Sequence, residues 1–291
     1  MSELRFGVLD VPDAQFPTLV SRWRRVEEFG FDFLYTADHY RHTRDPFLPW
    51  FDAWTVVAAM AFETETVRIG PLVTNPVLRG PAVVAKAAVA IDHLSGGRLE
   101  LAVGKGVEEF DHRAVGLPYW PAAERTARFR EYVKVVDGLL RSTEAPFTFE
   151  GRYYSTYETV VSPAPVQEPR PPLTVGGESP TVRQIAAESA DCWNTFALGD
   201  ARLGEIVEVV RRRNEDLDER CLALDRDPRS LRRSLVLWKP LDPWETPDAF
   251  ERIVTSFREV GIYEFNVMWP PDDRLHLLER AAAAIRSFRE S

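Results

Sequence analysis

Residues 99–116, LELAVGKGVEEFDHRAVG, join an apolar run to groups that could do acid–base chemistry. The run is typical of a buried strand, and it ends at Gly104 and Gly106, where a backbone without side chains could approach a ligand closely. Glu108 and His112 follow in one loop and could point toward the same ligand. Carboxylates and imidazoles are common proton-transfer groups in enzymes. The same residues are equally compatible with a solvated turn.

Other candidate groups also follow apolar, strand-like runs. His39 comes directly after the run FLYTAD, and an unperturbed imidazole titrates near neutrality, so His39 is the first candidate acid/base. A glycine pair before a predicted helix could expose backbone N–H groups to an anion, although a tight turn capped by Ser179 is the alternative. The residues at these run ends are Asp38, Thr74, Asn75, Gly176, Gly177, Glu178, Ser179 and Asn194.

The Gly104-Lys105-Gly106 segment matches neither of two familiar phosphate-binding motifs. Glu109 stands where a dinucleotide fingerprint would have its third glycine. Leu99 replaces the first glycine of a phosphate loop, and Gly106 replaces its Ser or Thr. The segment therefore points to no nucleotide by itself.

The elements that must position these groups alternate between short apolar runs and amphipathic helical patterns. This alternation predicts eight strand–helix pairs, and eight pairs favour a closed (β/α)8 TIM barrel over an open doubly wound sheet. Active sites of such barrels lie at the C-terminal ends of the strands, where the candidate groups fall. The predicted strands are 5–10, 33–38, 67–75, the start of 99–116, 173–177, 192–196, 231–240 and 264–269.

One segment does not fit a minimal barrel. Residues 142–172 are rich in proline and aromatic residues, which predicts an insertion with a hairpin between the fourth helix and the fifth strand. We expect Tyr153, Tyr154 and Tyr157 of this insertion to close over a substrate. The chain is otherwise assigned to a single domain over residues 1–291.

Composition excludes several classes of partner. The net charge of −9 and the lack of a lysine- or arginine-rich block argue against a nucleic-acid partner. No apolar stretch is long enough to cross a bilayer, and residues 1–10 do not resemble a signal peptide, so we expect a cytoplasmic protein. Two cysteines fit a reducing compartment, and without a Cys/His cluster we expect no metal site.

The segment GPAVVAKAAVAIDHLSGGRLELAVGKG resembles the luciferase-like superfamily of flavin and deazaflavin oxidoreductases. Its continuation, FDHRAVGLPYWPAAERTARFREYVKVVDGLL, is similar to members that use the deazaflavin coenzyme F420. FEGRYY, PAPVQEPRPPLTVGG and AAESADCWN match further landmarks in the same order. The resemblance covers roughly residues 5 to 200, and the last quarter matches only through the barrel pattern.

The resemblance implies that a flavin or deazaflavin ring lies across the strand ends. His39 matches a position beside the ring, and residues 72–74 match a bulge on which the ring rests, often with a non-proline cis peptide. Gly104 and Gly106 match the loop that passes the cofactor side chain, and residues 176–177 match the phosphate-binding turn. Two departures stand out: Lys105 replaces a small residue, as in some FMN monooxygenases, and Gly80 replaces a common histidine.

We therefore expect an oxidoreductase that transfers hydride between F420 and a small organic substrate, with His39 and then Glu108 as acid/base catalysts. Alternatives are a monooxygenase using reduced FMN and oxygen, a catalytically silent flavin-binding protein, and a barrel enzyme for a phosphorylated metabolite. Relatives commonly pair, so we expect a homodimer through the second and third helices. The expected cofactor-binding residues are Asp38, His39, Leu72, Val73, Thr74, Asn75, Gly104, Lys105, Gly106, His112, Gly176, Gly177, Glu178, Ser179 and Asn194.

Overall fold

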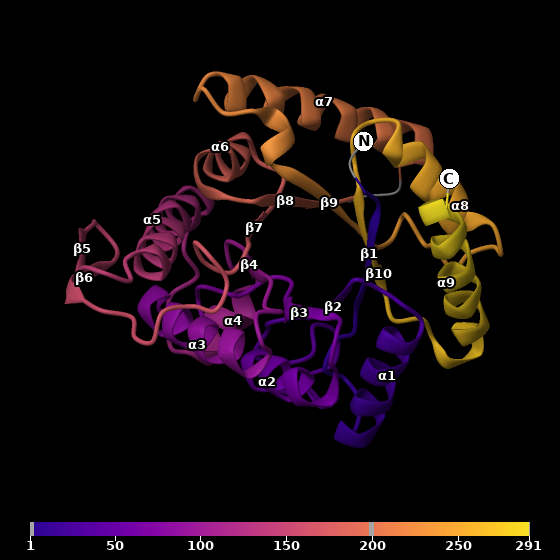
Figure 1. Cartoon of the computed structure of the whole chain (residues 1–291), viewed down its shortest axis with the longest axis horizontal. Coiled ribbons are helices and arrows are strands. Elements are labelled where there is room, and N and C mark those ends of the chain that lie inside the picture. The colour runs from indigo at the N-terminus through magenta and orange to yellow at the C-terminus, as the bar shows by residue number, and fades with distance from the viewer. Residues whose placement is uncertain (1–2, 198–200, 291) are drawn as a thin grey trace.

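Eight parallel strands form a nearly closed barrel in the computed structural model, which describes residues 3–197 and 201–290 (Figure 1). Hydrogen bonds join the strands in the order β3-β2-β1-β10-β9-β8-β7-β4. Parallel bridges Ile69–Leu99 and Thr74–Val103 link the two ends of this order, so the predicted (β/α)8 barrel is confirmed and the open sheet is not. The strands are β1 (Arg5–Leu9), β2 (Phe33–Thr36), β3 (Arg68–Pro71), β4 (Leu101–Val103), β7 (Leu173–Gly176), β8 (Cys192–Phe196), β9 (Arg232–Leu237) and β10 (Glu264–Met268).

Helices surround the barrel, and α2 and α6 begin at side chains that cap them. The Asp52 side chain accepts a hydrogen bond from Thr55 N at 2.9 Å where α2 begins. The Ser179 hydroxyl accepts one from Val182 N at 3.4 Å before α6, as the capped-turn interpretation predicts. The helices are α1 (Phe16–Glu28), α2 (Ala53–Glu63), α3 (Pro81–Leu94), α4 (Glu109–Ala114), α5 (Ala122–Arg141), α6 (Pro180–Ser189), α7 (Leu203–Leu222), α8 (Ala249–Arg258) and α9 (Leu275–Glu290).

Side-chain alternation along the strands divides the core in two. Val8 and Leu34 belong to the large cluster between strands and helices, whereas their neighbours Leu9 and Tyr35 belong to a smaller cluster inside the barrel. Trp193 is fully buried in the large cluster, so it is a core residue. The inner cluster comprises Leu9, Phe33, Tyr35, Leu72, Ala102 and Val236.

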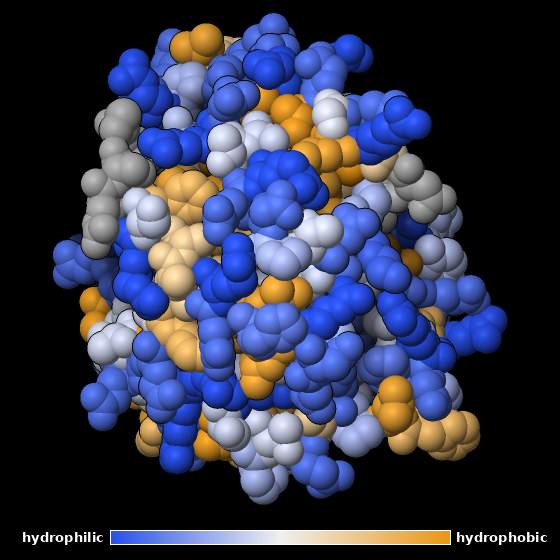
Figure 2. Space-filling model, turned by 90° about the vertical axis from the view of Figure 1, so that its right-hand side faces the viewer, coloured by the Kyte–Doolittle hydropathy of each residue, from blue (hydrophilic) through white to orange (hydrophobic). Residues whose placement is uncertain are grey.

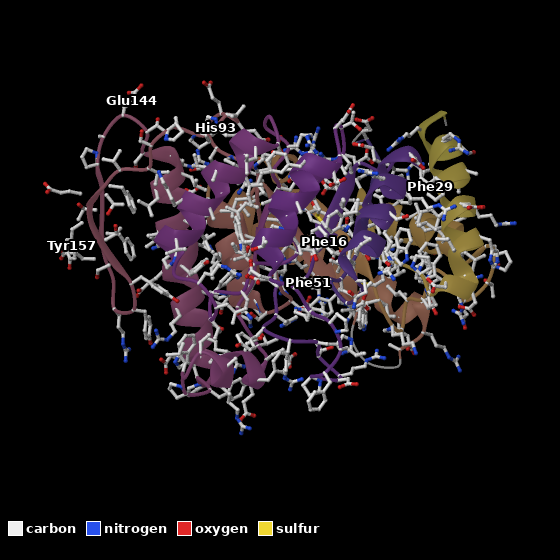
Figure 3. The ribbon with its side chains drawn as sticks, turned by 90° about the horizontal axis from the view of Figure 1, so that it is seen from below. Phe16, Phe29, Phe51, His93, Glu144 and Tyr157 are labelled. Carbon is white, nitrogen blue, oxygen red and sulfur yellow. The ribbon has the colours of Figure 1, made fainter. Side chains whose placement is uncertain are left out.

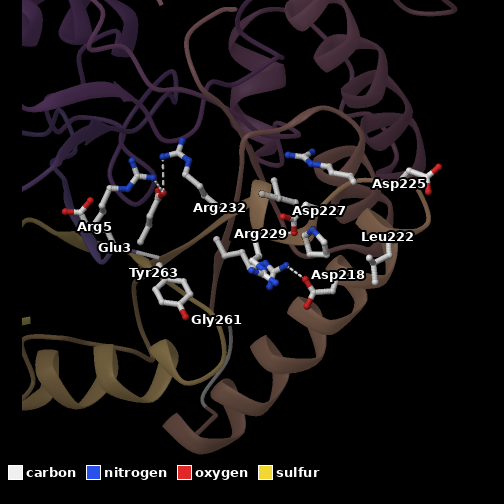
Figure 4. A pocket seen from close by; sticks show the side chains of 15 residues that line it. Glu3, Arg5, Asp218, Leu222, Asp225, Asp227, Arg229, Arg232, Gly261 and Tyr263 are labelled. Carbon is white, nitrogen blue, oxygen red and sulfur yellow. Dashed lines mark hydrogen bonds and ion pairs between the residues drawn. The ribbon is translucent and has the colours of Figure 1, made fainter. Parts of the chain in front are cut away.

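A chain of ion pairs closes the N-terminal end of the barrel. Glu264 pairs with Arg5 and, at 2.9 Å, with Arg232. Arg232 also reaches Glu100 at 3.0 Å, and Arg68 reaches Glu100 at 2.5 Å. A cavity of about 950 Å³ opens beside these ion pairs. Figure 4 shows Arg5 and Arg232 pointing toward one another at the wall of this cavity. This end lies opposite the strand ends that carry the candidate groups.

The predicted hairpin is confirmed, but its role as a lid is wrong. β5 (Phe147–Glu150) pairs with β6 (Ser155–Thr159) on the outer side of α5 (Figures 1 and 3). The Phe147 ring packs against Gly138, where a side chain would overlap it, and the Glu131 carboxylate accepts three backbone N–H groups from residues 152–154. Tyr157 is 63% exposed at the molecular edge. The hairpin is thus anchored to a helix rather than placed over the strand ends.

The surface over α8 and α9 is dominated by hydrophilic side chains with small apolar areas between them (Figure 2). Across the described residues, every helix is too short or too polar to span a bilayer.

Candidate active site

His39, three residues beyond β2, is held by α4 and by a later part of its own loop. Its Nδ1 lies 2.8 Å from Oδ2 of Asp111 at the start of the barrel's fourth crossover, and its carbonyl accepts a hydrogen bond from Trp50 Nε1 at 2.7 Å. The rings of Phe110 and Trp50 lie 5.7 and 6.1 Å from the imidazole. The side chain remains 27% exposed. The imidazole is therefore held in place on one side and accessible on another.

Asp111, on α4, is fully buried and accepts three hydrogen bonds. Its Oδ1 accepts from Tyr40 N at 2.8 Å, and its Oδ2 accepts from Asn75 Nδ2 at 2.7 Å as well as from His39. A carboxylate on Nδ1 selects the tautomer whose Nε2 carries a lone pair, which is the form that can accept a proton. Sequence reasoning assigned no role to Asp111, although its place in the loop after β4 was a usable signal.

Asp38 and Asn75 are linked to His39 by hydrogen bonds that pass through Asp111. Asp38 accepts hydrogen bonds from Asn75 N at 2.9 Å and from Arg79 at 2.8 and 2.9 Å. Burial raises the pKa of Asp38 although Arg79 and the Asn75 N–H act in the opposite direction. Arg79 also pairs with Asp52 at the start of α2. A continuous chain of polar contacts thus runs from Arg79 through Asp38, Asn75 and Asp111 to His39, and sequence reasoning had missed Arg79 as its first member.

The strand-3 bulge has the form that the resemblance implies. The Leu72–Val73 peptide bond is cis. The Val73 side chain packs against two glycines: a Cβ on Gly104 would overlap its Cγ2, and one on Gly176 would lie 3.0 Å from its Cγ1. These glycines are therefore needed for the close approach of Val73, whereas the sequence suggested room for a ligand. Gly106 adopts φ +65° and lies against Asn75, so it too has a local structural reason.

The turn after β7 is tied to the neighbouring strand. The Gly177 N–H donates to the carbonyl of Asn194 at 3.1 Å, and the Gly177 carbonyl accepts from Trp193 Nε1 at 2.8 Å. The Asn194 amide donates to Ser234 Oγ at 2.9 Å inside the barrel, where it is buried. The Gly177 amide is thus engaged within the protein, and the proposed role of this turn in anion binding stays a prediction.

Glu108 and His112 share a loop but have different surroundings. The half-buried Glu108 carboxylate has no hydrogen bond or ion pair among residues 3–197 and 201–290. The His112 ring is fully buried, 5.2 Å from the Tyr119 ring and 4.8 Å from the Trp120 ring, and its Nδ1 contacts the Glu108 carbonyl. Glu108 is free to meet a ligand, whereas His112 is enclosed by aromatic rings and its expected cofactor contact remains untested.

Comparison with known proteins identifies the family. Residues 4–225 match the family described as "Luciferase-like monooxygenase". The chain belongs to this family. It is 34% identical over 241 residues to the F420-dependent glucose-6-phosphate dehydrogenase of Intrasporangium calvum, covering 77% of this chain and 70% of that protein. It is 27% identical over 188 residues to the 5,10-methylenetetrahydromethanopterin reductase of Archaeoglobus fulgidus, covering 65% of this chain and 52% of the reductase.

A solved structure supports the fold of this luciferase-like enzyme. An F420-dependent secondary alcohol dehydrogenase, in complex with an F420–acetone adduct, superposes with a TM-score of 0.80 at 20% identity, covering 98% of this chain and 100% of the other. Together with the family match, these relatives show a flavin- or F420-dependent oxidoreductase of the luciferase-like type.

The residues at the strand ends fit a redox cofactor with a polar ring and an anionic tail. The Thr74 hydroxyl is buried and has no hydrogen-bond partner within the described ranges, so a donor or acceptor on a ring could satisfy it. Lys105 contributes a half-buried cation from the loop after β4. His39 supplies an exposed imidazole edge.

Proposed function

We propose that this luciferase-like enzyme transfers hydride between coenzyme F420 and a small organic substrate, with His39 as the acid/base catalyst. The observation that carries the proposal is the contact between His39 Nδ1 and the buried Asp111 carboxylate, which leaves Nε2 for a substrate. The F420-dependent relatives support the choice of cofactor.

F420, when bound, supplies the hydride acceptor or donor. The protein then needs only to orient the substrate and to move one proton. His39 Nε2 accepts that proton from a substrate hydroxyl during oxidation and returns it during reduction, while Asp111 holds the ring and stabilises its charged form. Glu108, whose carboxylate has no partner in the described structure, is the second candidate for this transfer.

An FMN-dependent monooxygenase is the second candidate function, and Lys105 supports it because the resemblance places a basic residue at this position in some FMN monooxygenases. A cation in the loop after β4 suits the phosphate of FMN as well as the phosphate of F420. A catalytically silent cofactor-binding protein would have the same cation but would turn over no substrate.

Separate titrations with F420 and FMN, followed by fluorescence quenching, test the proposal. We expect tight F420 binding and weak FMN binding, followed by loss of the visible absorbance of oxidised F420 with at least one member of a panel of secondary alcohols and sugar phosphates. His39→Ala should then reduce turnover by about 10²- to 10⁴-fold while F420 still binds. Preferential FMN binding would favour the monooxygenase, and an unchanged rate in the variant would remove His39 from the mechanism.

We also propose that the enzyme forms a homodimer through α2 and α3. Their outer faces expose Phe62 (72%), Val83 (61%) and Leu94 (46%), which are large apolar side chains that a partner surface could cover. Light scattering on the purified protein should give twice the mass of the chain, and Phe62→Glu should shift it toward the monomer. A monomeric wild type would reject the proposal.

A further inference from the structure

A group of charged side chains lies at the C-terminal ends of β4, β7 and β8. Lys105 comes two residues after β4, Glu178 comes two residues after β7, and Arg213 reaches β8 from α7. Lys105 is close enough to Glu178 and to Arg125 of α5 for both charges to act on its pKa. Elements far apart in the sequence thus bring two cations, Lys105 and Arg213, to one carboxylate.

The Glu178 carboxylate is held across the strand ends rather than turned to solvent. Its Oε1 accepts a hydrogen bond from Phe196 N at 3.3 Å and a long one from Thr195 Oγ1 at 3.5 Å. Arg213 Nη1 in turn donates to Thr195 Oγ1 at 3.1 Å. The buried Thr195 hydroxyl therefore links the cation to the carboxylate, and Glu178 acts as a counter-ion without touching Arg213.

The positive charges of Lys105 and Arg213 are not neutralised by a directly paired carboxylate. Neither Lys105 nor Arg213 lies within ion-pair distance of a carboxylate in the parts of the chain that the structure describes. Burial is the main cause that lowers the pKa of each, because a charge removed from water without a close partner is destabilised. Arg79, by contrast, pairs directly with Asp38 at 2.8 Å, and Arg98 donates hydrogen bonds to the backbone carbonyls of Val67, Ala61 and Thr64. An added anion would stabilise this group.

We propose that Glu178 is an internal counter-ion that occupies the phosphate site of the cofactor and competes with the phosphate for Lys105 and Arg213. The inference rests on the proposed function, since F420 and FMN both carry a phosphate ester. A phosphate placed near these cations would meet the negative charge of Glu178, and like charges at short range oppose binding. Cofactor binding therefore requires that Glu178 moves away or takes up a proton.

The competition depends on pH in a defined direction. Burial raises the pKa of Glu178, while the Phe196 N–H, Arg213 and Lys105 act to lower it. The other charged group that packs here is Arg183 of α6, which donates to the Glu178 carbonyl and pairs with Asp216. Above its raised pKa Glu178 is charged and competes, and below that pKa it is neutral and does not. Cofactor affinity should therefore rise as pH falls.

The test measures dissociation constants for F420 and FMN by fluorescence quenching at about pH 5 and pH 8.5, because a raised pKa makes a larger fraction of Glu178 neutral at the lower pH. Glu178→Gln keeps an acceptor for Phe196 N but removes the charge. The matched control is Glu188→Gln on the exposed face of α6, the helix that follows Glu178, where the carboxylate pairs with Arg130. Comparing variants at each pH cancels any titration of the cofactor itself.

We expect Glu178→Gln to bind both cofactors about tenfold more tightly than the wild type at the higher pH, with the ratio falling toward one at the lower pH. Glu188→Gln should match the wild type throughout, and riboflavin, which lacks the phosphate, should show no difference between the proteins. Weaker binding by Glu178→Gln would show that the Glu178 carboxylate contributes to cofactor binding, which would overturn the proposal. Equal affinity at both pH values would overturn it as well.

Failure of the proposed function gives a different result. If the wild type binds neither cofactor, thermal unfolding in inorganic phosphate still tests the charge competition. Glu178→Gln should then gain more Tm from phosphate than the wild type or Glu188→Gln does. An equal gain in all three proteins would reject Glu178 as a competing counter-ion.

Discussion

Replacing Asp111 by Asn should reverse the tautomer of His39, because the hydrogen bonds around this side chain allow only one amide orientation. Oδ1 accepts from the backbone N–H of Tyr40, which cannot become an acceptor. The amide oxygen must therefore take this position, and the new NH2 group must face Asn75 Nδ2 and His39 Nδ1, both of which now donate to Oδ2.

Asn75 cannot relieve the conflict by turning over, since its own Oδ1 accepts from Val77 N at 3.0 Å. His39 must then offer a lone pair at Nδ1 and carry its proton on Nε2. Hydrogen bonds to a charged group contribute about 1.5–3 kcal/mol each, and one donor remains facing another. We therefore expect Asp111→Asn to lower the free energy of unfolding by about 2–4 kcal/mol and to reduce turnover by about 10²- to 10⁴-fold.

Two assays check this reasoning without a known substrate. Urea unfolding measures the loss of stability, and ¹⁵N NMR of the imidazole shows which nitrogen carries the proton. Glu109→Gln is the control, because it removes an exposed charge two residues away on the same helix. A variant that kept the proton on Nδ1 and lost less than about 0.5 kcal/mol would refute the assigned role of Asp111.

Three further predictions concern the scaffold. Gly104→Ala should cost about 1–3 kcal/mol because its methyl group would overlap Val73, whereas Gly80→Ala, with no atom within 4 Å of the added carbon, should be nearly neutral in the same unfolding assay. Glu264→Gln should cost about 3–5 kcal/mol because two arginines at the barrel floor lose their shared carboxylate, and a loss no larger than that of Glu109→Gln would contradict this. Burial raises the pKa of Asp10 to about 7, so the native state holds one more proton than the unfolded state between about pH 4 and 7. The free energy of unfolding should therefore fall by up to about 4 kcal/mol as pH rises through this range. Asp10→Asn should remove this dependence of stability on pH.

The barrel could be predicted because each strand is buried on both faces and ends at residues that stop a strand. The predicted run 67–75 was nevertheless too long: β3 ends at Pro71, and the chain bends at the cis Leu72–Val73 bond before Thr74 bridges Val103. The six-residue helix α4 was not predicted, since so short a segment shows little more than one helical turn. Local patterns thus located the elements better than their ends.

The sequence predicted some residues of the candidate site but not the contacts between them. His39 was selected because it follows a strand, and the structure places it in a chain of polar contacts that the resemblance did not describe. Asp111 lies 72 residues further along the chain, and a separation of that length leaves no local pattern. Thr195 and Glu178 are only 17 residues apart, but their contact joins the ends of two neighbouring strands and depends on how those strands pair.

By itself, the sequence determined the barrel, its hairpin insertion and the family, because repeated apolar runs and contiguous motifs depend on neighbours along the chain. Only the tertiary structure decided that Asp111 holds His39, that Val73 is the reason for two glycines, and that the hairpin packs outside α5. Those outcomes depend on which side chains the closed barrel brings together. Burial strengthens each polar contact among them and raises the cost of leaving a polar group unpaired.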